Sequence, residues 1–132
     1  WRFRRVLFRS GVDAVEIDRF RVSLDRTPTM RERFFTSDEL EDVDGQSDPV
    51  PSLAARFAAR EAVMKAMGLG LGAFEFHDVS IRRAESGRPL LIVGGRAAEL
   101  ASSRGIGEWH VSLTHTDSMA IAYVVAARGS NS

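Results

Sequence analysis

The residue of this sequence best placed to do chemistry is a glutamate on the apolar side of a predicted helix. The segment SLAARFAAREAVMKAMG has helical periodicity, and Glu61 falls in the same stripe as its apolar residues. Those apolar residues are Leu53, Phe57 and Met64. A carboxylate that faces a core has to be paired, protonated or bound to a cation, because burial of a bare charge is costly. Lys65 follows one turn later, so an ion pair with Glu61 is the structural alternative.

A second carboxylate, Asp13, ends a predicted strand near the start of the chain. Two carboxylates on separate rigid elements suit a magnesium ion that keeps water ligands and bridges to a phosphate. Arg56, Arg60 and Lys65 lie on the same helix as Glu61 and would bind phosphate oxygens as charge-assisted donors. Two structural alternatives stay open: Asp13 as a helix cap, and GLGLG at 68–72 as an ordinary loop. GLGLG is not a P-loop, because no Gly-Lys-Ser/Thr follows it.

Polar side chains alternate along a predicted strand near the C-terminus. His110, Ser112 and Thr114 fall on one side of this strand, and His115 follows at the turn. A Ser-His-Asp triad is rejected, because neighbouring strand residues point to opposite faces and no nucleophile elbow surrounds the serine. The pattern favours a polar strand face that lines a ligand pocket, with a solvated sheet face as the alternative.

The elements that position these residues alternate between strands and helices. The strand ending at Asp13 precedes a helix around residues 17–24, and Thr36 or Ser37 is predicted to cap a short acidic helix. Ser52 is predicted to cap the long helix, which stops at Gly68. A strand is predicted at 76–83, and a returning strand follows at 89–93. A helix then runs from after residue 95 to about residue 104, and a strand pair at 108–114 and 119–126 closes the chain. The sum is an α+β fold with a mainly antiparallel sheet.

Composition narrows the classes of protein further. The 132 residues contain no cysteine, which excludes a disulfide scaffold, a thiolate zinc site and a cysteine nucleophile. No apolar run is long enough for a membrane span, and the balance of 18 basic and 18 acidic residues does not favour nucleic acid. We therefore expect one cytoplasmic domain that binds neither membrane nor nucleic acid.

The first ten residues, WRFRRVLFRS, hold four arginines and no acid. They read either as a basic first strand or as foreign sequence, since FRRVLFRS resembles a sequencing adaptor translated in one frame. We expect residues 1–10 to be a non-native leader, residues 11–127 to be the domain, and residues 128–132 to be a flexible tail.

Three segments together resemble the motifs of the short holo-acyl-carrier-protein synthase type of 4′-phosphopantetheinyl transferase. The segments are GVDAVEIDRF, RFAAREAVMKAMGLGLG and HVSLTHTDSMAIAYVV, with FFTSDEL and SGRPLL between them in the matching order. The resemblance covers residue 11 to about residue 127. It implies the fold of that family, in which a mainly antiparallel sheet packs against a long central helix and three chains form a trimer.

The resemblance also implies an activity. The enzyme would transfer the 4′-phosphopantetheine arm of coenzyme A to a serine of an apo acyl carrier protein, in fatty acid biosynthesis, and release adenosine 3′,5′-bisphosphate. Asp13 and Glu61 match the family's Mg²⁺ ligands. Lys65 matches the lysine that stabilises or protonates the departing phosphate. Glu61, directly or through a metal-bound water, is the candidate for taking the serine proton.

Further residues match positions near coenzyme A in the family, where each site lies at a subunit boundary of a homotrimer. They are Arg56, Arg60, Lys65, Gly68, Gly70, Gly72, Arg88, Pro89, Ser112, Thr114 and His115. The chain departs from the family pattern at Phe8, Arg9 and Ser10, where members have a small or apolar run with glycine. This departure puts the first strand in doubt.

Charge along the chain suggests where the carrier protein docks. Residues 19–33 hold five arginines and two acids, and carrier proteins are acidic, so we expect docking at Arg19, Arg21 and Arg26. A solvated helix face is the alternative. The acidic run that follows, Asp38, Glu39, Glu41, Asp42, Asp44 and Asp48, is interpreted as a solvated surface.

Two other functions stay open on the sequence. The same chemistry could act on carrier domains of polyketide or other multifunctional synthases. Alternatively, the chain could be a non-catalytic binding or assembly domain in which Glu61 and Lys65 form only an ion pair. Magnesium-dependent labelling of apo carrier protein with coenzyme A separates these functions.

Overall fold

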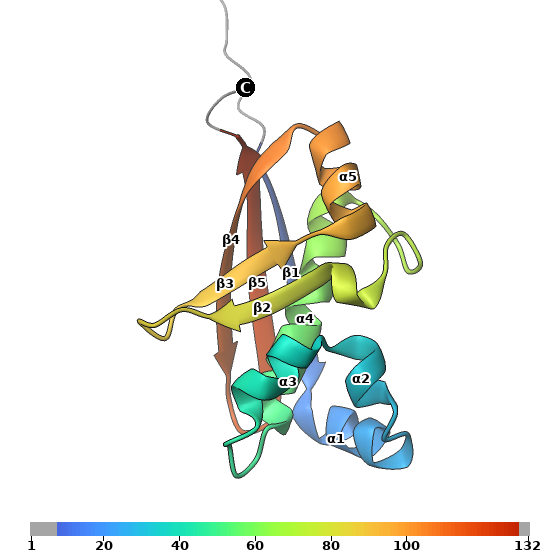
Figure 1. Cartoon of the computed structure of the whole chain (residues 1–132), viewed down its shortest axis with the longest axis vertical. Helices are drawn as coiled ribbons and strands as arrows, with labels where there is room; N and C mark the ends of the chain where they lie inside the picture. Colours follow the sequence, from blue (N-terminus) through green and yellow to red (C-terminus); the bar gives the residue numbers. More distant parts are fainter. Residues whose placement is uncertain (1–7, 130–132) are drawn as a thin grey trace, which may run out of the picture.

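The computed structural model describes residues 8–129, and the expectations for residues 1–7 and 130–132 lie outside this range. Within this range, four helices follow the first strand, and one further helix separates two strand pairs (Figure 1). In order they are β1 Phe8–Glu16, α1 Ile17–Arg26, α2 Met30–Phe34, α3 Ser37–Val43, α4 Val50–Met67, the 3-10 turn η1 Phe76–Asp78, β2 Val79–Arg83, β3 Pro89–Val93, α5 Gly95–Ser103, β4 Ile106–His115 and β5 Met119–Arg128. The α+β class and the antiparallel pairing are confirmed.

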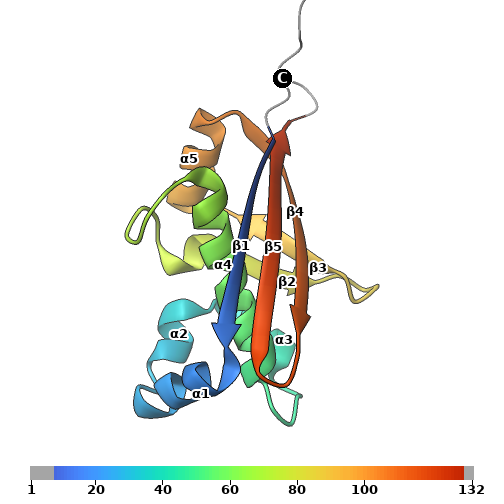
Figure 2. The ribbon, with the colours of Figure 1, turned by 180° about the vertical axis from the view of Figure 1, so that it is seen from behind.

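A three-stranded antiparallel sheet has the order β1-β5-β4. The inward side chains of β5 are small and fully buried, because α4 packs directly against them. They are Ala120, Ala122, Val124 and Ala126. The opposite face of this sheet carries no helix within the described residues (Figure 2).

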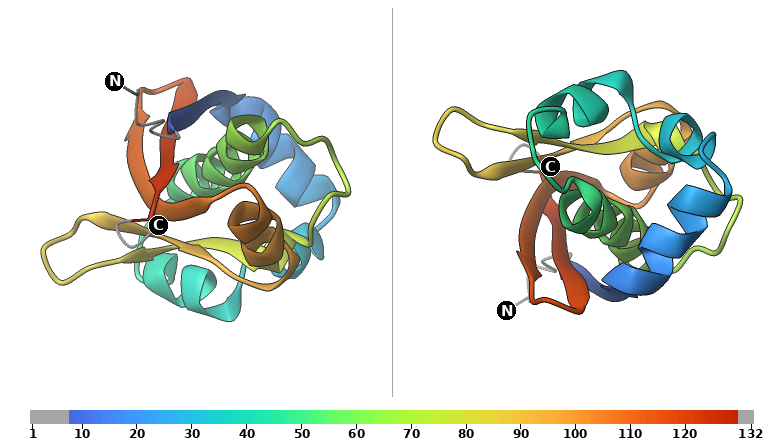
Figure 3. Two further views of the ribbon diagram at one scale, coloured as in Figure 1. Left: turned by 90° about the horizontal axis from the view of Figure 1, so that it is seen from above. Right: turned by 90° about the horizontal axis from the view of Figure 1, so that it is seen from below.

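Helix α4 lies between this sheet and the two-stranded sheet β2-β3 (Figure 3). It contacts β1 and β5 on one side and β2 on the other. Thirteen of its 18 residues are buried, many of them alanines that allow close packing on both sides. Gly68 ends the helix in the left-handed conformation, with φ of 70°, as the sequence predicts.

Gly11 fixes how closely β1 approaches α4. A Cβ added at this residue would overlap the carbonyl oxygen of Ala62 and would lie 2.8 Å from the backbone nitrogen of Ala66. Only glycine therefore allows the two backbones to come so close. This contact places Asp13, two residues further along β1, beside α4.

Helices α1, α2 and α3 form a separate group at one end of the molecule, around a second core (Figure 1). Phe20, Phe35 and Leu53 belong to this core, and each is at most 6% exposed. Thr36 caps α3 as predicted, because its hydroxyl accepts the Glu39 N–H while the Glu39 carboxylate accepts the Thr36 N–H.

Four local predictions differ from the structure. Strand β1 extends to Glu16, and its first residues pair with β5 from Phe8 onward, so the doubted first strand is formed. Ser52 does not cap α4, which begins at Val50, and its hydroxyl donates instead to Gln46. The stretch 76–78 is a 3-10 turn rather than strand. Helix α2 was not predicted, because five residues are too short for a helical period to show.

None of the helices between residues 8 and 129 is both long and apolar enough to cross a membrane.

Candidate active site

Asp13, Glu61 and Lys65 come together where β1 packs against α4. The Lys65 ammonium lies 2.7 Å from Asp13 Oδ1 and donates to the Val12 carbonyl oxygen at 3.2 Å. Asp13 and Glu61 line the same cavity. Lys65 thus forms its ion pair with Asp13, 52 positions away in the sequence. The ion pair with Glu61, which the sequence offered as an alternative, is not the one that forms.

Phe57 and Glu61 line this cavity, whereas Leu53 and Met64 of the same predicted stripe are buried in the core. Phe57 and Glu61 are half-buried and Lys65 is exposed, whereas most other positions of α4 are buried. The predicted stripe is therefore divided, because its two ends are buried as expected while its middle borders the cavity. Since α4 lies between two sheets, apolar residues surround most of it, and the side that carries Phe57, Glu61 and Lys65 remains more open.

The pKa of the Glu61 carboxyl is raised by its surroundings. Desolvation raises the pKa of the Glu61 carboxyl, the neighbouring Asp13 charge raises it further, and Arg60 and Lys65 oppose this rise. Two carboxylates this close repel each other when both are ionised. A bound cation would relieve that repulsion.

The pair fits magnesium. Mg²⁺ is bound in proteins by one or two carboxylates, with waters and substrate phosphates completing its shell. Among the described residues no cluster of three or more acidic, histidine or cysteine side chains forms a closed metal cage. Asp13 and Glu61 could therefore hold such an ion only together with water or a ligand phosphate.

The cavity beside the carboxylates is large and largely apolar in its lining. It has a volume of about 610 Å³ and lies between β1, α1, α2 and α4. Its apolar walls come from Phe20, Met30, Phe34, Phe57 and Leu71, and Arg19 lies at its edge. Leu71, in the GLGLG loop, is 82% exposed.

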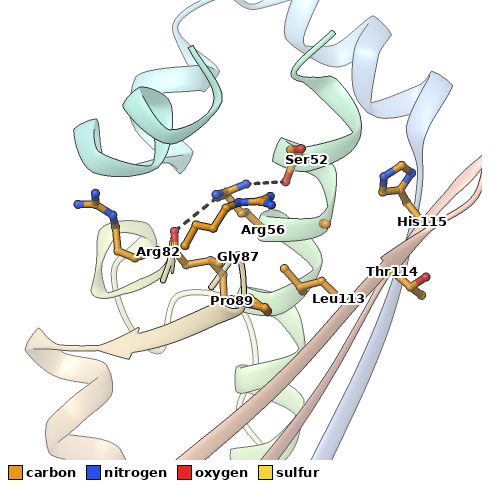
Figure 4. Close-up of a pocket in the computed structure, with 11 residues that line it drawn as sticks. Ser52, Arg56, Arg82, Gly87, Pro89, Leu113, Thr114 and His115 are labelled. Atoms are coloured by element: carbon orange, nitrogen blue, oxygen red, sulfur yellow. Dashed lines mark hydrogen bonds between the residues drawn. The ribbon is translucent and has the colours of Figure 1, made fainter. Parts of the chain in front are cut away.

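A second pocket, of about 200 Å³, lies between the start of α4, the β2-β3 hairpin and the end of β4 (Figure 4). Four of the residues predicted to lie near coenzyme A line this pocket, namely Arg56, Pro89, Thr114 and His115. Arg82, Arg83 and Ser52 also line it, and the sequence analysis missed them. Arg82 and Arg83 could have been suspected, because they end a strand directly before the turn that carries Pro89.

The two sites occupy different faces of α4. Arg56 and Glu61 are five residues apart, which places them about 140° apart around the helix axis. Arg56 lines the smaller pocket and Glu61 the larger cavity. One chain therefore does not present both groups to one side.

Arg60 is placed differently from the other predicted ligand residues. Its side chain is 1% exposed, donates to the Val79 carbonyl oxygen at 3.0 Å and lies 3.8 Å from Glu39 Oε1. Phe35 and Phe76 cover its guanidinium. Burial lowers the Arg60 pKa to about 10. The structure makes Arg60 part of a buried ion pair that joins α4 to α3 and β2, and not a surface phosphate ligand.

The remaining predicted residues near coenzyme A lie outside the two main cavities. Gly72 borders a small cavity beneath its loop, together with Arg60. Ser112 lies on the exposed face of β4 opposite Tyr123. Gly68, Gly70 and Arg88 are exposed. These residues are not brought together with the carboxylates within one chain.

The three arginines predicted for docking differ in their surroundings. Arg19 is 82% exposed, lies beside Glu16 and borders the larger cavity. Arg26 is exposed at the end of α1. Arg21 instead donates two hydrogen bonds to Asp48, at 2.9 and 2.8 Å, so it anchors α1 to the segment before α4.

The interpretation of the acidic run as a solvated surface holds for its four exposed residues and is wrong for Glu39 and Asp42. Glu39 is completely buried and binds the Ile81 N–H at 2.9 Å. Asp42, with a side chain 16% exposed, pairs with Arg82 and Arg56, while Asp38 and Asp48 pair with arginines at the surface. Local sequence could not reveal this, because the partners lie on other elements.

Comparison with known proteins identifies relatives of this chain. The model of the 4′-phosphopantetheinyl transferase superfamily matches residues 9–124. A holo-[acyl-carrier-protein] synthase of Streptomyces avermitilis is 47% identical over 116 residues, which are 88% of this chain and 94% of the relative.

Solved structures agree. The holo-[acyl-carrier-protein] synthase of Neisseria meningitidis superposes with a TM-score of 0.81 at 30% identity, over 89% of this chain and 96% of the other. The Helicobacter pylori enzyme of the same name, solved in complex with coenzyme A, superposes with a TM-score of 0.77 at 28% identity, over 89% and 98% of the two chains.

Proposed function

Because this chain belongs to the 4′-phosphopantetheinyl transferase superfamily, we infer that it is an enzyme with holo-[acyl-carrier-protein] synthase activity. It transfers the 4′-phosphopantetheine arm of coenzyme A to a serine of an apo acyl carrier protein and releases adenosine 3′,5′-bisphosphate. The observation that carries the assignment to a site is the meeting of Asp13, Glu61 and Lys65 beside one cavity.

We propose the following roles for these side chains. The Glu61 carboxylate accepts the proton of the carrier serine while the serine oxygen attacks the β-phosphorus of coenzyme A. The bond from that phosphorus to the oxygen bridging to the α-phosphate breaks, and the Lys65 ammonium neutralises the charge on the departing bisphosphate. The raised pKa of Glu61 makes it a better base than an ordinary carboxylate.

We further propose that Asp13 and Glu61 bind Mg²⁺. When bound, the ion would neutralise the charge of the pyrophosphate, which is the main requirement of phosphoryl-type transfer. The support for this proposal is the mutual repulsion of the two carboxylates in a half-buried setting. Lys65, already held 2.7 Å from Asp13, is positioned to reach the same phosphate group.

The smaller pocket is proposed to receive the nucleotide end of coenzyme A. Arg56, Arg82 and Arg83 supply positive charge there, and Pro89 supplies an apolar surface. Five further contacts to coenzyme A stay predictions, and they would come from a neighbouring subunit or a rearranged loop. They involve Gly68, Gly70, Gly72, Arg88 and Ser112.

A homotrimer would unite the two sites. The uncovered face of the β1-β5-β4 sheet carries an apolar row that an assembly would bury, and Figure 2 shows this face free of helices. Val12 is 53% and Tyr123 45% exposed there, and Ile121 and Val125 continue the row along β5. Assembly through this face is our proposal for how the Glu61 side of one chain meets the Arg56 side of another.

The acyl carrier protein is proposed to dock beside the larger cavity. Arg19 lies at the rim of that cavity, next to the carboxylates, and can attract an acidic partner. Arg26 adds charge at the end of the same helix, whereas Arg21 is already engaged by Asp48. We propose a cytoplasmic carrier of fatty acid biosynthesis as the physiological substrate.

The decisive experiment is labelling of apo carrier protein with coenzyme A in the presence of magnesium. Asp13→Ala and Glu61→Ala should each abolish labelling, and removal of magnesium with a chelator should do the same to the unchanged enzyme. Glu99→Ala, which removes an exposed carboxylate of α5, is the matched control and should keep full activity. Full activity of Asp13→Ala and Glu61→Ala would refute the mechanism.

A panel of apo carriers then decides the partner. The fatty acid synthase carrier should give the highest kcat/KM. A preference for a polyketide or multifunctional synthase carrier would overturn that part of the proposal and leave the chemistry intact.

A further inference from the structure

Two of the three arginines that line the proposed nucleotide pocket, Arg56 and Arg82, are held by carboxylates of α3. The Arg82 guanidinium forms a two-point contact with Asp42, with Nε to Oδ2 at 3.1 Å and Nη2 to Oδ1 at 3.3 Å. Its third nitrogen, Nη1, lies 3.0 Å from Asp38 Oδ2. All three nitrogens of Arg82 are thus engaged by α3, and Figure 4 shows its side chain extending away from Thr114 and His115.

Asp42 also faces the buried arginine of the pocket. Arg56 Nη2 lies 3.8 Å from Asp42 Oδ2, and the Arg56 side chain is only 2% exposed. The hydrogen bonds of Arg56 to the carbonyl oxygens of Ile81 and Ser52 are long, at 3.5 Å each. Asp42, with a side chain 16% exposed, is therefore the carboxylate shared by both arginines.

This arrangement sets up a competition. A ligand phosphate prefers the same planar guanidinium edge that a carboxylate occupies. Any phosphate entering the pocket must either replace Asp42 at Arg82 or bind against its charge. Asp42 thereby opposes the affinity of the pocket for anionic ligands while it keeps the unliganded arginines paired.

Building on the proposed function, we propose that Asp42 is a positioning residue that sets phosphate specificity. By holding Arg82 and Arg56, it weakens the binding of the phosphate groups of the nucleotide, and the arginines are released from it when that ligand binds. The inference concerns the strength and selectivity of binding, and it leaves the transfer chemistry unchanged.

The test is calorimetric titration with two probes, adenosine 3′,5′-bisphosphate and uncharged adenosine. Asp42→Asn should tighten the Kd of the bisphosphate by about fivefold or more, because one opposing charge is removed within a few ångströms of the ligand. The Kd of adenosine should not change. In steady state, KM for coenzyme A should fall while kcat is kept.

Two further variants make the result specific. Asp44→Asn removes the same charge at the exposed end of α3, and should change the bisphosphate Kd by less than twofold. Asp38→Asn loosens only Arg82 and should therefore tighten bisphosphate binding less than Asp42→Asn does. If Asp42→Asn is unstable because it loses the Arg56 contact, Asp38→Asn still tests the inference. An equal gain from Asp44→Asn, or no gain from either Asp38→Asn or Asp42→Asn, would overturn the inference.

The two proposals fail in different ways. An unchanged protein that binds neither coenzyme A nor the bisphosphate would contradict the proposed function. A protein that binds both, but whose Kd does not respond to Asp42→Asn and Asp38→Asn, would contradict only the role of Asp42.

Discussion

At the scale of single residues, Glu61 combines a cost in stability with a use in chemistry. Its pKa is raised because it is half-buried and lies beside Asp13. A carboxyl group whose pKa is higher in the folded than in the unfolded state binds its proton more tightly when folded. Its contribution to stability is therefore present below the unfolded pKa, and is lost as the pH rises through the folded pKa.

Glu61→Gln should therefore raise the melting temperature at pH 7 in the absence of divalent cations. The gain should shrink as the pH falls toward the ordinary glutamate pKa of about 4.3. Thermal unfolding from pH 4 to pH 8 measures this, with the exposed Glu41→Gln as the control. Magnesium chloride should stabilise the unchanged protein and not Glu61→Gln. A melting temperature that falls at pH 7 would contradict the assigned electrostatics.

Arg19 leads to a prediction about the carrier protein. Arg19→Glu should raise KM for the apo carrier by about tenfold at low salt, with little change in KM for coenzyme A, because the charge at the docking rim is reversed. Added salt should reduce the difference. Arg96→Glu, on the exposed side of α5, is the matched control. An unchanged carrier KM for Arg19→Glu at low salt would exclude docking at this residue.

At the scale of elements, the approach of β1 to α4 positions Asp13. Gly11→Ala should destabilise the fold by about 1–3 kcal/mol, because the added methyl group meets the backbone of α4 at Ala62 and Ala66. Activity should also fall under conditions in which the variant is still folded, because β1 carries Asp13. Urea unfolding measures the stability. Gly45→Ala has no atom within 4 Å of the added Cβ and should be neutral.

The buried pair between α3 and α4 gives a second prediction at this scale. Glu39→Ala should cost about 3 kcal/mol or more, because it leaves the Arg60 charge buried without its carboxylate and removes the acceptor of the Ile81 N–H. Glu41→Ala, at an exposed position of the same helix, should stay within about 0.5 kcal/mol of the unchanged protein. Equal stability of the two variants in chemical unfolding would show that the buried pair of Glu39 with Arg60 does not contribute this free energy of unfolding.

At the scale of the whole molecule, the two pockets on different faces of α4 are the reason that we propose an assembly. Val12→Glu places a charge in the apolar row of the open sheet face and should convert the proposed trimer into monomers that lack activity. Light scattering coupled to size-exclusion chromatography measures the mass. Ile92→Glu changes a side chain of similar exposure, 47% against 53%, on the other sheet and should remain trimeric. A monomeric unchanged protein with full activity would refute shared sites.

The sequence by itself determined most of the elements and the motif residues for which we propose chemical roles. The cap at Thr36, the stop at Gly68 and the strand pairs could be predicted, because capping, left-handed glycine and apolar periodicity act over a few neighbouring residues. Residue types alone suggested that Asp13 acts together with Glu61 and Lys65 but left structural alternatives open, and the resemblance then matched all three to one site.

Only the tertiary structure decided which charges meet. Lys65 pairs with Asp13 across 52 positions, Arg82 with Asp42 across 40, and Arg60 is buried against Glu39 of another helix. It also decided that Arg56 and Glu61 face different sides of the molecule. These outcomes depend on how α4 fits between two sheets, because burial by distant segments fixes whether a charged side chain becomes a ligand, an ion-pair partner or part of the core.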